Sequence, residues 1–123
     1  MTQRTTRILA VMLGATAVMA GAFGAHGLKD MVTPERLEVW KTGAHYQLIH
    51  AVVLLVLSLL PSPPRLAVLL ITTGIGIFSG SLYLLVLLDQ KMLGMVTPFG
   101  GVSMILGWLL LLRALPKDNQ PVL

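Results

Sequence analysis

Four long apolar runs, separated by short polar or proline-containing segments, set the pattern of this chain. The runs lie at about residues 8–25, 44–60, 65–88 and 98–115. With 17 to 24 residues, each run is long enough for a helix to cross the hydrocarbon core of a bilayer. Because short connections place consecutive helices side by side in opposite directions, we predict an all-α, polytopic membrane protein. Its four transmembrane helices would form one antiparallel bundle and a single domain over residues 1–123, with a polar tail at 116–123.

Three pairs of a hydroxyl residue followed by proline mark predicted helix starts. They are Thr33-Pro34, Ser62-Pro63 and Thr97-Pro98. In each pair the hydroxyl residue would be the N-cap, and the proline would take the first helical position, where an N–H group has no intrahelical partner. The start at Pro34 opens an amphipathic stretch, residues 34–43, which precedes the second apolar run and is expected in the head-group region.

Polar side chains around the second run follow two helical stripes. One comprises Glu38, Lys41 and His45, and the other comprises Trp40, Gly43, Gln47 and His50. Because residues three or four apart share a helix face, we expect the first stripe to reach water at the interface and the second to face inward. By helix rise His50 lies near the bilayer midplane, where an ionisable residue is by default a functional candidate. The alternative, which we favour, is a neutral imidazole that hydrogen-bonds a facing group.

Hydroxyl groups on the third run offer partners for the inward stripe. Ser79 and Tyr83 would reach Gln47 or His50, which favours a packed, hydrogen-bonded seam over a substrate site. His26, at the end of the first run, is expected at the same membrane face as Glu38 and His45, so a site shared by these three is the functional alternative. The candidate functional or polar-seam residues are therefore His26, Glu38, His45, Gln47, His50, Ser79 and Tyr83.

Small residues recur at helical spacing in the first, third and fourth runs, a pattern that lets membrane helices approach closely. The expected helix-packing positions are Gly14, Gly21, Gly24, Gly76, Gly80, Gly100 and Gly107. Gly76 and Gly80 form a GxxxG spacing, which is weak evidence by itself because glycine is common in membrane helices. Trp108, inside the fourth run, is expected to be a packing aromatic.

The first run also has features of a secretory signal peptide. A basic start, an apolar middle and the small residues Ala20-Gly21-Ala22 fit that pattern. The stripe of small residues continues through and past the candidate cleavage position. We therefore expect a retained helix.

Composition narrows the class of protein. The chain of 123 residues is 55% hydrophobic and only 11% charged, with a mean hydropathy of +0.83, whereas soluble domains have about 25% charged residues. The formal charge is +4, but the nine basic residues are scattered among the predicted helix ends. A nucleic-acid surface would need them on one face. We interpret them as determinants of topology and lipid head-group contact, and expect no nucleic-acid partner.

Two further observations concern topology and cysteine chemistry. The end with both termini would carry Arg4, Arg7, Arg65, Arg113 and Lys117, and the other end would carry Lys29, Arg36, Lys41 and Lys91. This small excess weakly predicts that both termini are cytoplasmic, in a multi-pass protein of the cell (inner) membrane. The chain has no cysteine, so disulfides, thiolate metal sites and cysteine nucleophiles are excluded.

Four segments carry a resemblance to a known family. They are GAFGAHGLK at 21–29, WKTGAHYQLIHAVVLL at 40–55, FSGSLYLLVL at 78–87 and TPFGGVSMILGW at 97–108. Together they resemble the YgdD/YwdK family of small bacterial inner-membrane proteins, assigned to domain of unknown function 423, with eukaryotic relatives called transmembrane protein 256. The resemblance implies a four-helix polytopic protein of the cytoplasmic membrane. It implies no reaction, because no biochemical function is established for the family.

Three functional hypotheses remain. We favour a non-catalytic packing, assembly or accessory subunit, as a homo-oligomer or within a larger membrane complex, whose small-residue faces bind the partners. The second hypothesis is a small transporter or channel component that acts as an oligomer, with Gln47, His50, Ser79 and Tyr83 along a polar path. The third is a metal or haem binder based on histidine, although His45 and His50, five residues apart, do not share one helix face. We assign no catalytic, cofactor-binding or metal residue, and expect neither enzymatic activity nor a cofactor.

Overall fold

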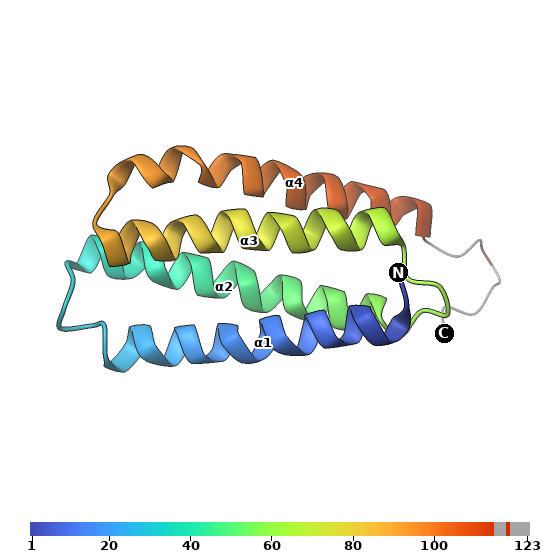
Figure 1. The fold of residues 1–123 in the computed structure, drawn as a ribbon, viewed down its shortest axis with the longest axis horizontal. Helices are drawn as coiled ribbons and strands as arrows, with labels where there is room; N and C mark the ends of the chain where they lie inside the picture. Colours follow the sequence, from blue (N-terminus) through green and yellow to red (C-terminus); the bar gives the residue numbers. More distant parts are fainter. Residues whose placement is uncertain (115–117, 119–123) are drawn as a thin grey trace.

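The computed structural model describes residues 1–114 and 118, and it forms four long helices joined by short connections (Figure 1). The helices are α1 (Gln3–His26), α2 (Pro34–Leu57), α3 (Arg65–Leu88) and α4 (Thr97–Leu110), with short 3-10 helices η1 (Lys91–Met95) and η2 (Leu111–Ala114). No strand occurs within the described part, which confirms the all-helical prediction. Most of the predicted polar tail, including Lys117, lies outside the described residues.

Only the start of α2 follows the predicted hydroxyl-proline pattern fully. The Thr33 hydroxyl accepts a hydrogen bond from the backbone N–H of Arg36, with 3.2 Å between oxygen and nitrogen. The Ser62 prediction is wrong: α3 begins after Pro64 and has no side-chain cap. The physical reason is that a residue before a proline avoids the helical conformation, so Pro63 cannot be the first helical residue.

The start of α4 differs as well. Val96 occupies the N-cap position, without a side-chain cap bond, and Thr97 is already helical. The Thr97 hydroxyl lies 2.6 Å from the Ser81 hydroxyl of α3 instead. This hydroxyl group therefore joins two helices rather than capping one.

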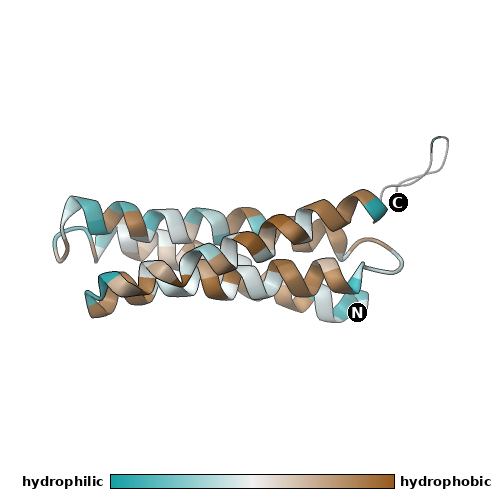
Figure 2. Cartoon of the chain, turned by 90° about the horizontal axis from the view of Figure 1, so that it is seen from above, coloured by the Kyte–Doolittle hydropathy of each residue, from teal (hydrophilic) through white to brown (hydrophobic). Residues whose placement is uncertain are grey.

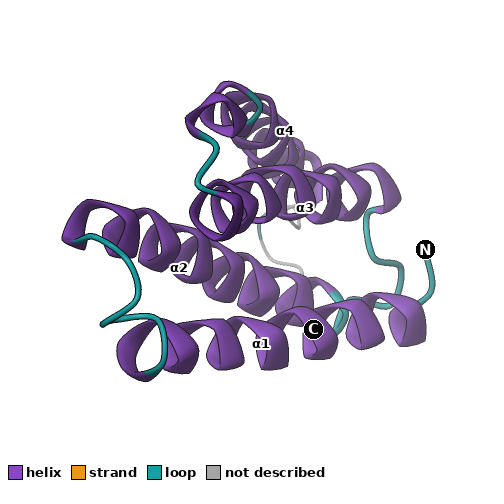
Figure 3. Cartoon of the chain, turned by 60° about the vertical axis from the view of Figure 1, so that its left-hand side comes forward, coloured by secondary structure: helices purple, strands orange, loops and turns teal. Residues whose placement is uncertain are grey.

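The four antiparallel helices are packed mainly in sequence order. Helix α1 packs on α2, α2 on α3, and α3 on α4, whereas helices that are not consecutive touch much less (Figures 1 and 3). At the end with the N-terminus, one buried apolar cluster joins all four helices. It contains Ala10, Leu54, Leu57, Val68, Ile71, Ile75 and Met104. A second cluster, Leu28, Trp40, Leu85 and Val86, lies towards the other end.

The outer surface of the bundle is apolar, as lipid contact requires. Large hydrophobic side chains such as Val11, Leu55, Leu66 and Ile105 are more than two-fifths exposed. Figure 2 shows hydrophobic residues over the length of the helices and hydrophilic ones gathered towards the ends. Such a surface favours a bilayer over water as the surrounding medium.

Three stretches are long and apolar enough to cross a membrane: α1, α3, and the stretch Lys91–Ala114 that contains α4. Helix α2 is not among them. Its first half carries charged residues, and its apolar half also contains the polar side chains of His45, Gln47 and His50. Three of the four predicted transmembrane helices are thus supported by length and composition. The span at α2 remains a prediction.

Candidate functional site: a buried polar seam

The inward stripe of α2 faces its neighbours as its spacing predicted. Trp40, Gly43, Gln47 and His50 are all buried, with 6% of Gln47 and 4% of His50 exposed. Around them lie polar side chains from the other three helices. We call this group the polar seam and define it as Thr16, Trp40, Gln47, His50, Ser79, Tyr83 and Trp108.

Gln47 links three helices and uses its whole amide group. Its Nε2 donates to the backbone oxygen of Leu13 at 2.9 Å and to the Thr16 hydroxyl at 2.7 Å, both on α1. Its Oε1 accepts a hydrogen bond from the Tyr83 hydroxyl of α3 at 2.7 Å. Because both amide hydrogens and the amide oxygen have partners, the burial of this polar side chain is compensated.

Both ring nitrogens of His50 also have partners, one on α4 and one on the backbone of α2. The indole Nε1 of Trp108 donates to His50 Nε2 at 3.0 Å, and His50 Nδ1 lies 2.7 Å from the backbone oxygen of Tyr46. An indole N–H can only donate, so Nε2 must accept and the ring proton must lie on Nδ1. The imidazole in this arrangement is neutral, and neither ring nitrogen is left for a metal or a proton carrier.

Trp40 of α2 contacts its neighbouring helices through both its N–H group and its ring. Its Nε1 donates to the backbone oxygen of Ala20 at 2.8 Å. Its ring lies against Tyr83, with 4.6 Å between ring centroids. A Cβ atom added to Gly24 would come within 2.7 Å of the Trp40 ring. Glycine at that position therefore makes room for the indole.

Ser79 bonds to the backbone rather than to a seam side chain. Its hydroxyl donates to the Gly43 oxygen of α2 at 2.6 Å. Between α3 and α4, the Ser103 hydroxyl likewise donates to the Leu70 oxygen at 2.7 Å. Hydroxyl-to-carbonyl bonds of this kind are a common link between membrane helices.

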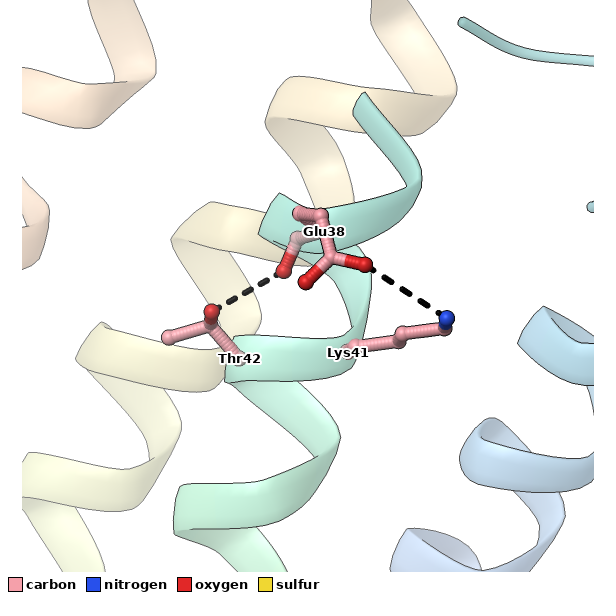
Figure 4. A network of polar contacts seen from close by, with 3 residues as sticks. All are labelled: Glu38, Lys41 and Thr42. Atoms are coloured by element: carbon pink, nitrogen blue, oxygen red, sulfur yellow. Dashed lines mark hydrogen bonds and ion pairs between the residues drawn. The ribbon is translucent and has the colours of Figure 1, made fainter. Parts of the chain in front are cut away.

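The remaining candidate residues lie on the surface and do not gather. Glu38 and His45 are exposed, as is His26 at the end of α1. Glu38 pairs with Lys41 at 3.5 Å, and its backbone oxygen accepts a hydrogen bond from the Thr42 hydroxyl (Figure 4). The described residues contain no group of three His, Cys, Asp or Glu side chains placed to hold a metal ion. His26, Glu38 and His45 therefore do not form a metal site in the described part of the chain.

The predicted glycine contacts divide into three classes. Gly24, Gly100 and Gly107 lie in tight contact with another helix, and Gly14 is in ordinary contact with Ala51. Gly21, Gly76 and Gly80 have open space where a Cβ would be, so their predicted packing within this chain is wrong. The reason is the rotation of each helix about its axis: these three glycines lie on faces of α1 and α3 that no other described helix covers.

Sequence reasoning missed several residues that the structure brings into contact. Gly74 is buried against α4, where an added Cβ would meet Met104 and the Gly100 oxygen. Thr16 joins the seam through Gln47, and Trp108 is a hydrogen-bond donor as well as a packing aromatic. For Trp108 the sequence did offer a signal, because a buried indole N–H group needs a hydrogen-bond acceptor. No such signal distinguished Gly74 from Gly76.

Three hollows on the described part of the molecule lie away from the seam. A hollow of about 560 Å³ lies beside the α1–α2 connection and the end of α3, next to an ion pair of Arg36 and Asp89 at 3.1 Å. Two smaller hollows involve arginines near the ends of the helices. None of these three is lined by Gln47, His50, Ser79 or Tyr83.

Comparisons with known proteins identify relatives along most of the chain. Residues 20–101 match the family described as "Protein of unknown function (DUF423)". A UPF0382 membrane protein of Staphylococcus aureus (strain bovine RF122 / ET3-1) is 42% identical over 111 residues, which cover 87% of this chain and 91% of that protein. The UPF0382 membrane protein YwdK of Bacillus subtilis (strain 168) is 39% identical, covering 89% and 94% respectively. No solved structure matches the chain.

Proposed function

Because the chain belongs to the DUF423 family of membrane proteins of unknown function, we propose that it is a non-catalytic assembly or accessory subunit of the cytoplasmic membrane. In this proposal all four helices cross the bilayer, and both termini are cytoplasmic. The partners are further copies of the chain or a larger membrane complex. The outward face of α3 around Gly76 and Gly80 is the surface that binds them.

The pairing of the polar seam carries this proposal. A transport path or a catalytic site needs polar groups that a substrate, ion or proton can reach. In the seam, the polar groups of Gln47, His50 and Trp40 are all used in bonds between or within helices. Among the described residues that are not exposed, only the Thr72 hydroxyl is fully buried without a partner. Such pairing supports a structural role for the seam.

Two observations support a span at α2. Its 24 residues extend about 36 Å, more than the roughly 30 Å of a hydrocarbon core. It also lies between α1 and α3 and packs on both. Because those neighbours are apolar enough to span, the buried half of α2 would lie at the same depth as they do.

Single cysteines test the four-span topology, because the natural chain has none. Thr2→Cys and Ser62→Cys lie at one end of the bundle, and Asp30→Cys and Gln90→Cys lie at the other. With a membrane-impermeant maleimide on intact spheroplasts, we expect labelling of Cys at 30 and 90 only, and of the other pair after permeabilisation. Labelling of positions 30 and 62 from the same side would show that α2 does not span.

The assembly proposal is tested by native mass spectrometry after extraction in a mild detergent, together with cross-linking in the membrane. We expect a complex heavier than one chain, and a disulfide-linked dimer when Thr73→Cys on the open α3 face is oxidised. Val18→Cys on the exposed face of α1 is the matched control. A strictly monomeric mass without any cross-linked product would refute assembly.

A further inference from the structure

A small hollow at the end of the molecule with the N-terminus lies between the first turn of α3 and the end of α4. Its volume is about 270 Å³, and two arginines, Arg65 and Arg113, line it. The rest of its lining is apolar: Pro64, Leu66, Ala67, Leu110 and Ala114. Two arginines among apolar residues give the hollow an amphipathic lining.

No ion pair found among the described residues involves either arginine. Residues 1–7, 58–66 and 110–114 contain neither Asp nor Glu, and the acidic residue that follows Arg113 in the described chain, Asp118, is exposed. The ion pairs found among the described residues, Arg36 with Asp89 and Lys41 with Glu38, belong to helix parts at the opposite end. The two arginines are therefore available to an anion from outside the described chain.

The start of α3 adds further donors beside Arg65. The helix has no side-chain cap, and its first intrahelical bond runs from the Val68 N–H to the Pro64 oxygen. The N–H groups of Arg65, Leu66 and Ala67 therefore lack intrahelical partners, at the positive end of the helix dipole. Guanidinium groups together with free N–H groups are the donors that proteins use to hold phosphate.

The outer surfaces of α3 and α4 near this hollow suit an acyl chain. Leu66 is 59% exposed, Leu109 is 57% exposed and Leu112 is 67% exposed. Both helical stretches are apolar enough to span a membrane, and the hollow lies at their ends, where head groups would be. A ligand held here would thus have its charged part at the arginines and its apolar part along the helices.

From these observations we propose that the hollow between α3 and α4 binds the phosphodiester group of an anionic phospholipid, with Arg65 and Arg113 as the anion ligands. An anionic lipid fits better than a zwitterionic one, because two guanidinium groups would repel a second, cationic head-group charge. The inference requires α3 and α4 to span the membrane. It does not depend on assembly with other copies.

The test is a lipid titration of the purified full chain, followed by native mass spectrometry. Phosphatidylglycerol is compared with phosphatidylcholine, for the natural chain and for the double variant Arg65→Gln/Arg113→Gln. The matched control is Arg4→Gln/Arg7→Gln, which removes the same charge at the same end from α1 alone. We expect the hollow variant to bind phosphatidylglycerol about tenfold or more weakly, because it loses charged hydrogen-bond donors, and the control to change about twofold at most.

The charge-conserving variant Arg65→Lys/Arg113→Lys separates loss of the site from loss of the fold. It should keep part of the preference for phosphatidylglycerol, and the helical circular dichroism of all variants should match that of the natural chain. Equal weakening by the two glutamine pairs, or equal binding of the two lipids by the natural chain, would overturn the proposal. Displacement of the lipid by millimolar inorganic phosphate would also overturn it, by identifying a site for a free anion.

Discussion

His50 and Trp108 are the residues at which chemistry and packing depend most directly on each other. The indole donates to the imidazole across two helices that are not neighbours in sequence. Their rings meet nearly edge to face, with 6.0 Å between centroids. This contact links α2 directly to α4. The two helices otherwise pack mainly on α3, which lies between them.

At this scale a double-mutant cycle tests the bond. We expect His50→Leu to lower the free energy of unfolding by about 1–2 kcal/mol, because it leaves the Trp108 N–H without an acceptor. His50→Gln should cost less, since its amide oxygen can accept that bond. In the Trp108→Phe background, His50→Leu should also cost less, because the donor is already gone. The measurement is reversible unfolding in bicelles or detergent.

Additive losses in this cycle would show that the two side chains do not interact. Equal loss of a cellular phenotype from His50→Gln and His50→Leu, with normal stability of the glutamine variant, would instead indicate specific imidazole chemistry. The structural role proposed for the seam would then be wrong.

At the scale of elements, the contact between α3 and α4 is determined by glycines. Gly74 and Gly100 face each other so closely that a Cβ on either would come within 2.8 Å of the other's backbone oxygen. Gly76, two residues further along α3, has open space around it. The two glycines of one helix thus have opposite structural requirements, although their surroundings in the sequence are alike.

Alanine substitutions should separate these two positions. Gly100→Ala forces the helices apart, and we expect a loss of about 1–3 kcal/mol or more in the free energy of unfolding. Gly76→Ala should be neutral or should stabilise the protein by up to about 1 kcal/mol, because alanine favours the helix. The same unfolding assay measures both variants. Similar losses at the two positions would contradict the arrangement of α3 against α4.

At the scale of the whole molecule, the helices are packed in sequence order, and the described residues leave part of their outward surfaces uncovered. If the open α3 face binds a partner, Gly76→Leu should reduce the mass of the complex without lowering the stability of the single chain, because the leucine fills space between chains. Native mass spectrometry and the unfolding assay together measure this. A Gly76→Leu protein with unchanged complex mass would exclude this face as the interface.

Much of the candidate site could be predicted from α2 alone. The spacing of Trp40, Gln47 and His50 placed them on one face, and their burial followed because polar groups within an apolar run need partners inside the protein. Their individual partners could not be predicted. Thr16, Tyr83 and Trp108 come from three other helices, and which of them reaches Gln47 or His50 depends on how each helix is rotated about its axis.

The sequence by itself determined the class of protein, the number of long helices and their approximate positions, because hydropathy, proline positions and helix period act within one segment. Tertiary structure decided which glycines lie in contact, which hydroxyl groups act as caps, and which polar groups pair. These outcomes depend on the depth and rotation of two helices at once. A residue pattern on one helix leaves both undetermined: Gly74 and Gly76 lie two residues apart on α3, and only the position of α4 separates the buried one from the open one.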